Sequence, residues 1–329
     1  MRNAVIHSTG TYVPERVIKN EYFDELLGEN VSEWLESYVK IYERRWCAED
    51  QSTSDLAIEA AQQAMQRGNV APEDVDLLII ATDTPEFISP STASKVQYKL
   101  GLVNAGSFDI NTACAGYVTA VDTASKYIKA DTNYNTVIVI GVYAMSKYLN
   151  LLDKKTANLF ADGSGCVILK SKETDSEGYL ASKLITKGEY HDYMGIYAGG
   201  TYKMIDEKVL ADKENLLVIA KKFPPEVNPQ MWSSIAKELS DKTKIKLDDV
   251  KMFFFTQINI NSIYETMEML NQPMKKTQTS MHYYGYTGSA CIPLAIEDAI
   301  KEGKLKRGDV FFMIGSGGGL SFAGAAFRY

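Results

Sequence analysis

Cys114 is the side chain of this sequence whose setting best fits nucleophilic chemistry. It lies in the stretch FDINTACAGY, residues 108–117, where the pattern changes from a strand to a helix. Unpaired N–H groups and the positive dipole end at a helix start favour a thiolate over a thiol. Ala113, Ala115 and Gly116 are small and leave room for a substrate beside the sulfur. These local features favour a nucleophile, and one more small buried core residue is the alternative interpretation.

Few other residues could assist a thiol. The chain contains three histidines and three further cysteines: His7, His191, His282, Cys47, Cys166 and Cys291. The cysteines are far apart and form no Cys-x-x-Cys pair, so neither a disulfide framework nor a zinc site is expected. We expect no metal and no resident cofactor, and we predict that the three other cysteines are structural.

The composition of the 329-residue chain is that of an ordinary globular protein, with 45% hydrophobic and 23% charged residues. A net charge of −7 argues against general binding to nucleic acid or to an anionic membrane surface. The opening residues MRNAVIHSTG lack the apolar core of a signal peptide. No apolar run approaches the roughly 18 residues of a membrane span. We therefore expect a cytoplasmic protein without a nucleic-acid or membrane partner.

Two parts of the chain share one order of elements. An amphipathic helical stretch followed by a continuous apolar run occurs at residues 54–81 and again at residues 231–255. Asp74 and Asp249, which precede the two apolar runs, are 175 positions apart. Apolar runs of strand length are typical of strands buried on both faces. The repeat predicts an α/β fold of two pseudo-symmetric halves with mixed, mostly parallel sheets and covering helices.

We place the boundary between the two halves near residue 171. The first half, residues 1–171, carries Cys114, and the second half covers residues 172–329. Residues from about 172 to 229 are polar and rich in tyrosine, which indicates a connector with excursions rather than a third domain. No Pro-, Gly- or Ser-rich linker separates the halves, so we expect them to pack tightly.

Several short motifs are informative because of their order and spacing. They are GTYVPERVIKN near the start, SEW at 32–34, the segment 90–101, NTACAGY, FADGSG at 160–165, AGG at 198–200 and GGG at 317–319. Together they resemble the β-ketoacyl-acyl-carrier-protein synthase III family of the thiolase-like superfamily, over essentially the whole chain. The resemblance implies a thiolase-like fold and a homodimer.

The resemblance also implies a reaction at Cys114. The thiol would accept an acyl group from a thioester such as acyl-CoA, which is a substrate rather than a cofactor. Acyl exchange between sulfurs is nearly isoenergetic, so the main demand is to stabilise the tetrahedral oxyanion. The backbone N–H groups of Cys114 and Gly318 are the expected donors. The nominal reaction is condensation with a malonyl thioester in fatty-acid or polyketide-type biosynthesis.

Two candidate catalytic positions depart from the family's pattern. Thr256, in FTQIN, stands where the family has the histidine of an HQAN-like motif. Tyr286 stands where the family has the asparagine of a GNTS-like turn. Threonine cannot replace imidazole as an acid–base group. Tyrosine, with a pKa near ~10, can donate a hydrogen bond but is much bulkier than asparagine. The substitutions leave the decarboxylation step open.

His282 is a candidate for the missing base. It lies four residues before Tyr286 on a presumed strand, and alternate side chains of a strand share one face. The alternative is a hydrogen-bonded or surface histidine without a catalytic role.

The resemblance further implies residues that bind substrate. Trp34 would stack on the adenine of CoA, Lys154 would attract phosphate, and Phe87 would reach the acyl pocket of the second subunit. Asn259 matches the last position of the HQAN-like motif. The segment that follows, residues 261–268, carries two acidic and no basic side chains. Such a surface disfavours docking of an acidic acyl carrier protein, since like charges then face each other.

Three functions remain open. The first is a condensing acyltransferase, which we adopt with condensation as the nominal reaction. The second is an acyltransferase in which Cys114 passes the acyl group to an alcohol, an amine or another acceptor without decarboxylation. The third is a non-catalytic partner subunit of an active paralogue, against which the retained NTACAGY and GGG motifs argue.

Overall fold

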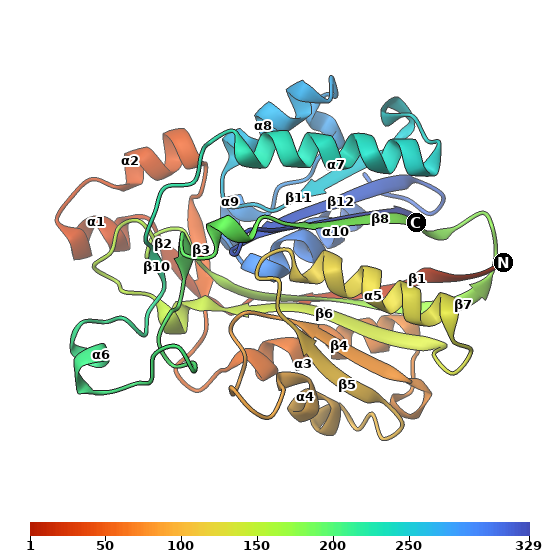
Figure 1. Ribbon diagram of the computed structural model, residues 1–329, viewed down its shortest axis with the longest axis horizontal. Coiled ribbons are helices and arrows are strands. Elements are labelled where there is room, and N and C mark those ends of the chain that lie inside the picture. The colour runs from red at the N-terminus through yellow and green to blue at the C-terminus, as the bar shows by residue number, and fades with distance from the viewer.

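Two central sheets organise the computed structural model, which describes all 329 residues (Figure 1). The first sheet has the strand order β1-β7-β6-β4-β5 and the second has the order β11-β12-β13-β8. The strands of the first sheet are β1 (Arg2–Tyr12), β4 (Leu77–Ala81), β5 (Gly106–Ile110), β6 (Thr136–Ala144) and β7 (Asp162–Glu173). Those of the second are β8 (Gly178–Thr186), β11 (Met252–Phe255), β12 (Val310–Gly317) and β13 (Ser321–Arg328).

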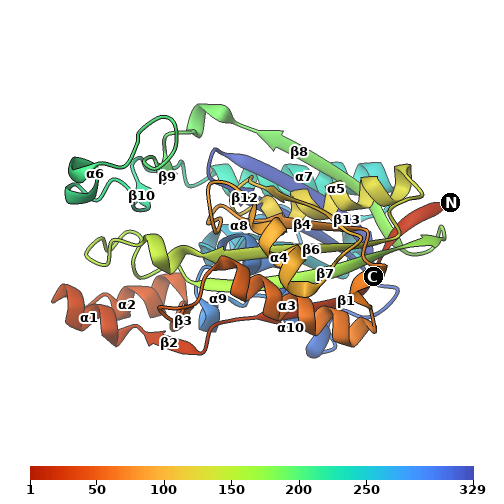
Figure 2. The ribbon, with the colours of Figure 1, turned by 90° about the horizontal axis from the view of Figure 1, so that it is seen from below.

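Helices cover the outer faces of both sheets and fill the space between them (Figures 1 and 2). The helices α3 (Thr53–Gly68) and α4 (Thr92–Leu100) pack on the first sheet. On the second sheet lie α7 (Val227–Thr243) and, packed against it, α8 (Ile260–Met269). Between the sheets lie α5 (Gly116–Ala130) and α10 (Cys291–Lys301). The α/β architecture with one sheet from each part of the chain agrees with the sequence prediction, while the domain boundary near residue 171 stays a prediction.

The sheets are mixed, as predicted, but parallel pairing is confined to the strands at one end of each sheet. Parallel pairs join β4 to β5, β4 to β6, and β11 to β12. Antiparallel pairs join β1 to β7, β6 to β7, β12 to β13, and β13 to β8. The expectation of mostly parallel sheets was wrong because each repeat closes with a strand that turns straight back along its neighbour.

The expected connector contributes to the fold. Its residues 178–186 form β8, an edge strand of the second sheet, and the rest makes an excursion with α6 (Glu207–Ala211) at one end of the molecule (Figure 2). The remaining helices and strands are β2 (Arg16–Lys19), α1 (Glu21–Leu27), α2 (Ser32–Trp34), β3 (Glu43–Trp46), β9 (Met194–Gly195), β10 (Val218–Ile219) and α9 (Met281–Tyr284), with a π-helical turn at Leu35–Val39 after α2.

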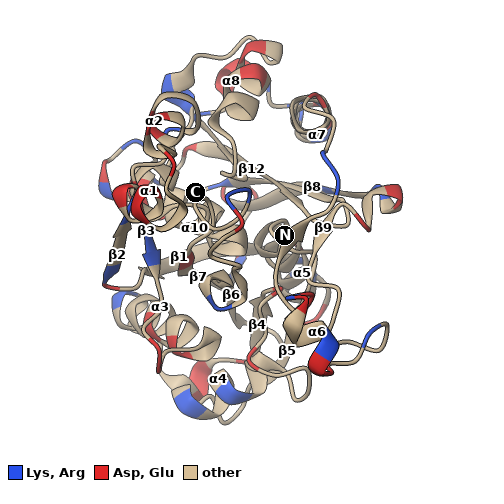
Figure 3. Ribbon diagram, turned by 90° about the vertical axis from the view of Figure 1, so that its left-hand side faces the viewer, with Lys and Arg blue, Asp and Glu red and all other residues tan.

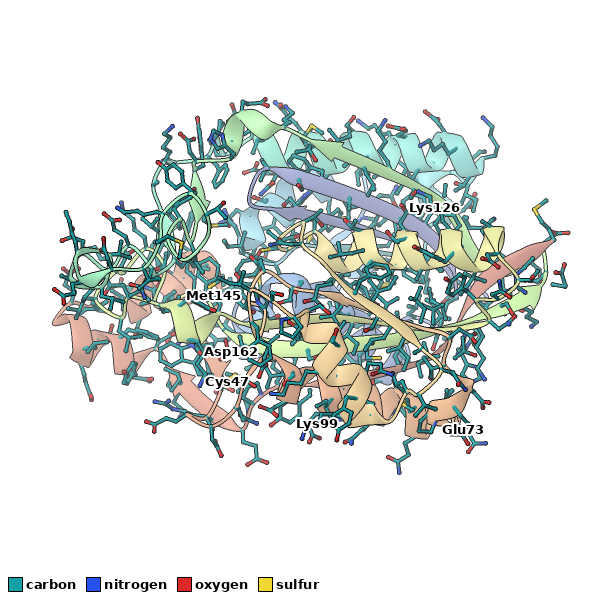
Figure 4. All side chains as sticks on the ribbon, turned by 60° about the horizontal axis from the view of Figure 1, so that its bottom comes forward. Cys47, Glu73, Lys99, Lys126, Met145 and Asp162 are labelled. Atoms are coloured by element: carbon teal, nitrogen blue, oxygen red, sulfur yellow. The ribbon has the colours of Figure 1, made fainter.

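A buried carboxylate ties the start of β7 to two neighbouring segments. Asp162 accepts hydrogen bonds from the backbone N–H groups of Cys47 at 2.7 Å and Ser146 at 2.8 Å. Figure 4 shows Asp162 beside Cys47. The aspartate of the FADGSG motif is therefore structural, because its bonds satisfy backbone donors that folding removes from water. Among the helices, none is both long and apolar enough to cross a membrane.

Candidate active site

Cys114 occupies the turn between β5 and α5. The turn is held by a bond from the N–H of Ala115 to the carbonyl of Thr112 at 3.2 Å and by one from Gly116 to Ala113 at 2.8 Å. Ala113 has a φ of 47°, in the left-handed region that non-glycine residues rarely adopt. A Cβ on Gly116 would lie 3.1 Å from the Cβ of Ala81, so the start of α5 packs directly on the end of β4.

The Cys114 thiol is not the stabilised thiolate that the helix start predicted. Its side chain is only 1% exposed. Burial raises the pKa of the thiol well above its ordinary value, and the negative charge of Asp83 raises it further. The Tyr286 hydroxyl, within hydrogen-bonding reach of the sulfur, acts in the opposite direction. At neutral pH Cys114 is therefore a neutral thiol, and its attack on a thioester requires a proton acceptor.

The last residue of β12, Gly317, lies against the nucleophile turn. A Cβ on Gly317 would lie 2.5 Å from the carbonyl oxygen of Thr112 and 2.6 Å from the nitrogen of Cys114, so this close approach requires glycine. The backbone N–H groups of Cys114 and Gly318 donate no hydrogen bond to another protein group. Two free N–H donors beside a thiol can stabilise an oxyanion.

A cavity of about 480 Å³ brings Cys114 together with the predicted site residues. Buried Cys114, Thr256 and Tyr286 line its inner end, together with Gly318. Trp34, which is 45% exposed, and exposed Lys222 line its outer part. Most of the remaining lining is apolar. A cavity of this size with a few polar groups at one end is typical of small-molecule sites.

The Thr256 hydroxyl is fully used by the backbone of Ser316. It donates to the carbonyl of Ser316 at 3.2 Å and accepts from the N–H of Ser316 at 2.8 Å. Thr256 is 1% exposed. Thr256 lines the cavity, but its only proton is already donated within the protein, and its match to the family's histidine stays a prediction.

Tyr286 belongs to a cluster of buried aromatic rings behind Cys114. Its ring centroid lies 5.3 Å from that of Phe160 and 6.5 Å from that of Tyr143. Burial raises the pKa of Tyr286 well above its ordinary value, and the neighbouring Cys114 contributes further. Tyr286 is therefore neutral at neutral pH and can donate a hydrogen bond to the sulfur or to a bound thioester.

His282 does not face the site, and the idea that it supplies the missing base was wrong. The residue lies in the short helix α9 rather than on a strand, so the alternation argument does not apply. Its Nδ1–H donates to the carbonyl of Lys40, and its Nε2 accepts from the Thr279 hydroxyl at 2.9 Å. The imidazole ring also stacks on Tyr42, with 5.9 Å between centroids. His282 is therefore the hydrogen-bonded histidine of the alternative interpretation.

Of the residues predicted to bind substrate, Trp34 and Asn259 line the cavity, whereas Lys154 lies outside it. Trp34 lines the cavity and stacks on Tyr38, with 6.3 Å between ring centroids. Asn259 also lines the cavity, and its Oδ1 caps α8 by accepting from the N–H of Asn261 at 3.0 Å. Lys154 lies outside the cavity, where its Nζ is 2.7 Å from the carboxylate of Glu29.

Phe87 does not reach the cavity that contains Cys114 of its own chain. The ring is 45% exposed and lines a separate hollow near β5, together with Ile88 and Phe108. The Nζ of Lys95 lies 5.9 Å from the centre of the ring. Whether Phe87 reaches a second subunit stays a prediction.

The helix α8 carries acidic but no basic positions, as its sequence indicates (Figure 3). The lysine that lines the cavity is instead Lys222, on the segment that precedes α7.

Two polar residues near Cys114 escaped the sequence analysis. Tyr143 is 1% exposed at the end of β6, and Asp83 follows the end of β4. A signal for Asp83 was present, since it continues the alternation of Leu77, Ile79 and Ala81, which share a core cluster with Cys114. Tyr143 lies within a continuous buried run, in which periodicity does not identify a face.

Solved structures share the whole fold. The crystal structure of 3-oxoacyl-[acyl-carrier-protein] synthase III from Aquifex aeolicus VF5 has a TM-score of 0.89 at 31% identity and covers 99% of this chain and 100% of that one. The synthase III structure from Thermus thermophilus has a TM-score of 0.90 at 30% identity and covers 99% of both chains. The protein therefore has the thiolase-like fold.

Sequence comparisons define the family within that fold. Residues 108–188 match the family model for 3-oxoacyl-[acyl-carrier-protein] synthase III, and residues 240–329 match the model for its C-terminal part. The β-ketoacyl-[acyl-carrier-protein] synthase III of Clostridium perfringens (strain SM101) is 35% identical over 328 residues, covering 100% of both chains. That of Fusobacterium nucleatum is 31% identical over 329 residues, 100% of this chain and 99% of the relative. The chain belongs to the 3-oxoacyl-acyl-carrier-protein synthase III family of condensing acyltransferases.

Proposed function

We propose that this protein is an acyltransferase that carries the acyl group on the sulfur of Cys114 and takes it from an acyl-CoA. The observation that carries the proposal is the inner end of the cavity, where a reactive residue type meets two unpartnered backbone N–H groups. That combination provides a nucleophile and an oxyanion site for acyl exchange between sulfurs.

The N–H groups of Cys114 and Gly318 would stabilise the oxyanion that forms when the sulfur attacks the thioester carbonyl. Gly317 supports this role because its lack of a side chain lets the end of β12 approach the turn at Thr112. Tyr286 would keep the sulfur oriented and donate a hydrogen bond toward it. Removal of one oxyanion donor in comparable sites lowers the rate about 10²- to 10³-fold.

The second half of the reaction depends on the acceptor. In the nominal reaction a malonyl thioester loses CO2 and its carbanion attacks the acyl group, as in fatty-acid biosynthesis. Thr256 cannot protonate or polarise the thioester while its hydroxyl is bonded to Ser316. The same observation favours the second candidate, transfer of the acyl group to an alcohol, amine or other acceptor, which needs only the nucleophile and the oxyanion donors.

The outer part of the cavity has features suited to the CoA portion of a donor. Trp34 offers a partly exposed aromatic face for a base, and exposed Lys222 offers a cation for phosphate. The acidic α8 makes an acyl carrier protein a weaker candidate for this surface than CoA.

A homodimer is part of the proposal. The strand β5 is an edge of the first sheet, and its residues are half-buried or exposed. Phe87 and Ile88, which are 45% and 84% exposed, lie beside this edge. A second copy that pairs with β5 would cover the edge and both side chains. We further propose that the protein acts in the cytoplasm without a resident cofactor.

The test is to mix the protein with acetyl-, butyryl- and octanoyl-CoA and to measure the mass of the intact chain. We expect one acyl adduct, its mass set by the donor, that is missing from Cys114→Ala and retained in Cys291→Ala. A chain that gains no adduct from any donor would be the non-catalytic partner subunit of the third interpretation. Addition of malonyl-CoA to the acylated protein then separates the first two candidates, since only condensation releases CO2.

A further inference from the structure

Asp83 is a buried carboxyl group next to the nucleophile that the proposed acyl transfer has not used. Its Oδ1 is enclosed by protein and has no hydrogen-bond partner, although part of the residue remains accessible. A carboxylate oxygen without a partner is costly to bury, so such groups are rarely present without a role.

The register of the first sheet directs Asp83 toward the site. Leu77, Ile79 and Ala81 of β4 lie in the same core cluster as Cys114, whereas Leu78 and Ile80 lie in the cluster beneath α3 and α4. The alternation continues past the strand, because the Thr82 and Thr84 hydroxyls lie 3.2 Å apart on the other face. Asp83 therefore projects to the side on which Cys114 lies.

The neighbouring strands place Asp83 between Cys114 and Tyr143. Ala81 pairs with Gly141 of β6, and the N–H of Ala144 donates to the Thr84 hydroxyl at 2.9 Å, so the register brings Asp83 level with Tyr143. On the other side Ala81 pairs with Ile110 of β5, and the N–H of Thr82 donates to the Ile110 carbonyl at 3.1 Å. This continuation leads directly into the turn that carries Cys114.

We propose that Asp83 is the proton acceptor for the Cys114 thiol during acylation, in the place of the histidine that the chain lacks. The inference rests on the acyl transfer proposed above and assigns the acid–base group of that same site. As the bond from sulfur to the thioester carbonyl carbon forms, the S–H bond breaks and the proton passes to the Asp83 carboxylate. When the tetrahedral intermediate collapses, the bond from carbon to the CoA sulfur breaks, and that sulfur takes the proton from Asp83.

The charges around Asp83 suit a proton acceptor. The titratable groups that face it are the Cys114 thiol and the Tyr143 phenol, with Tyr286 and Cys291 beyond them. No lysine or arginine pairs with the carboxylate, and burial raises its pKa to about 6. A group with that pKa is mostly ionised at pH 7 and is close to the optimum for a general base. Concerted transfer also avoids a thiolate beside a carboxylate, the combination that keeps the thiol protonated.

Asp83→Asn separates this role from a purely electrostatic one because the two predict opposite effects. Loss of a negative charge alone would favour the thiolate and speed every reaction of Cys114. Loss of the proton acceptor would slow acylation, whereas alkylation by iodoacetamide, which captures thiolate already present at equilibrium, would be as fast as before or faster. We expect acylation by acetyl-CoA at pH 7 to fall about 100-fold in Asp83→Asn. Asp50→Asn, which changes an exposed carboxylate, should match wild type in both reactions.

The pH profile supplies a second readout. Acylation of the wild type should rise with a midpoint near pH 6, the value to which burial raises the pKa of Asp83, and Asp83→Asn should lose this limb. Asp83→Glu keeps a carboxylate and should recover the rise of the acylation rate with pH, at a reduced rate. This variant also tests the inference if Asp83→Asn does not fold. Acylation of Asp83→Asn at half the wild-type rate or more, at every pH, would overturn the inference alone. Failure of every acyl-CoA to acylate the wild type would instead overturn the proposed function and this inference with it.

Discussion

The hydroxyl of Thr256 is bonded in both directions to the backbone of Ser316, at 2.8 Å from its N–H and 3.2 Å to its carbonyl. Threonine at this place therefore joins β11 to the end of β12 at the inner end of the cavity. The position that we predicted to match the family's histidine has a structural side chain in this protein.

Thr256→Val should destabilise the fold and spare acylation. The change keeps the shape of the side chain but leaves the N–H of Ser316 buried without an acceptor, which costs about 1–3 kcal/mol of the free energy of unfolding. Urea unfolding measures the loss, and the acylation rate of Cys114 should change less than about 3-fold. Thr277→Val is the matched control, since the buried Thr277 hydroxyl has no partner to lose. Equal stability losses in the two variants would contradict the structural role of Thr256.

Gly317→Ala should displace the nucleophile turn. The added Cβ would lie 2.5 Å from the carbonyl oxygen of Thr112, so the turn or the end of β12 must move. Misplacement of a reacting group by about 1 Å can lower a rate about 100-fold. We expect a loss of that order in the acylation rate, measured by mass spectrometry of the intact protein. Gly188→Ala, where no atom lies within 4 Å of the added Cβ, should retain the wild-type rate.

His282→Gln should leave chemistry unchanged, because both ring nitrogens are bonded away from the cavity. The lost bonds to Lys40 and Thr279, with the lost stacking on Tyr42, should lower the free energy of unfolding by about 1–2 kcal/mol. Acylation of Cys114 is measured beside thermal unfolding. A 10-fold or larger fall in the acylation rate with little change in stability would return His282 to the list of catalytic candidates.

Asp83→Asn should stabilise the protein in a pH-dependent way. Burial raises the pKa of folded Asp83 to about 6, whereas an unfolded aspartate has a pKa near ~3.9. The folded state therefore holds the proton more tightly. The contribution of the Asp83 carboxyl to stability is fully present below about pH 4 and is lost as the pH rises through about 6. The variant should match wild type in unfolding free energy near pH 4 and exceed it by about 1–3 kcal/mol at pH 7.

The effect of Asp83 is isolated by the difference in unfolding free energy between Asp83→Asn and wild type at each pH. Asp298, whose pKa burial also raises to about 6, contributes equally to both proteins and cancels in that difference. A difference that stays constant from pH 4 to pH 7 would show that the Asp83 carboxyl is not perturbed by the fold. A gain in stability with a loss of acylation would be typical of a buried group retained for function.

The sequence was sufficient for the repeated architecture and for the position of Cys114 at a turn between a strand and a helix, because both leave local signals. The buried strands at 77–81 and 252–255 are continuous apolar runs, and the cysteine lies among small residues where a strand meets a helix. The state of the thiol was not predictable in this way. The helix start favours a thiolate locally, but burial and the charge of Asp83 outweigh it, and both arise from distant segments.

The sequence also did not predict the roles of side chains that depend on where the side chain points. His282 was placed on a strand because it precedes a turn like that of Cys114, yet the second repeat has the short helix α9 there. Lys154 was expected to attract phosphate, but the structure pairs it with Glu29 and puts Lys222 at the cavity. Such contacts depend on packing between remote segments, which local sequence patterns do not predict.

Restoring the family's pair should create decarboxylase activity. Thr256 and Tyr286 both line the inner end of the cavity with Cys114. Thr256→His and Tyr286→Asn together would therefore put an imidazole and an amide beside a bound malonyl thioester. The smaller asparagine also gives up volume that the imidazole needs, which limits overpacking. We expect conversion of malonyl-CoA to acetyl-CoA to rise about 100-fold over wild type, the usual scale of acid–base assistance.

Each single change should give less than a tenth of that gain, because the histidine lacks space without Tyr286→Asn and the asparagine acts alone without the imidazole. If wild type already decarboxylates malonyl-CoA as fast as the double variant, Thr256 and Tyr286 are no obstacle to condensation, and transfer to another acceptor loses its main support.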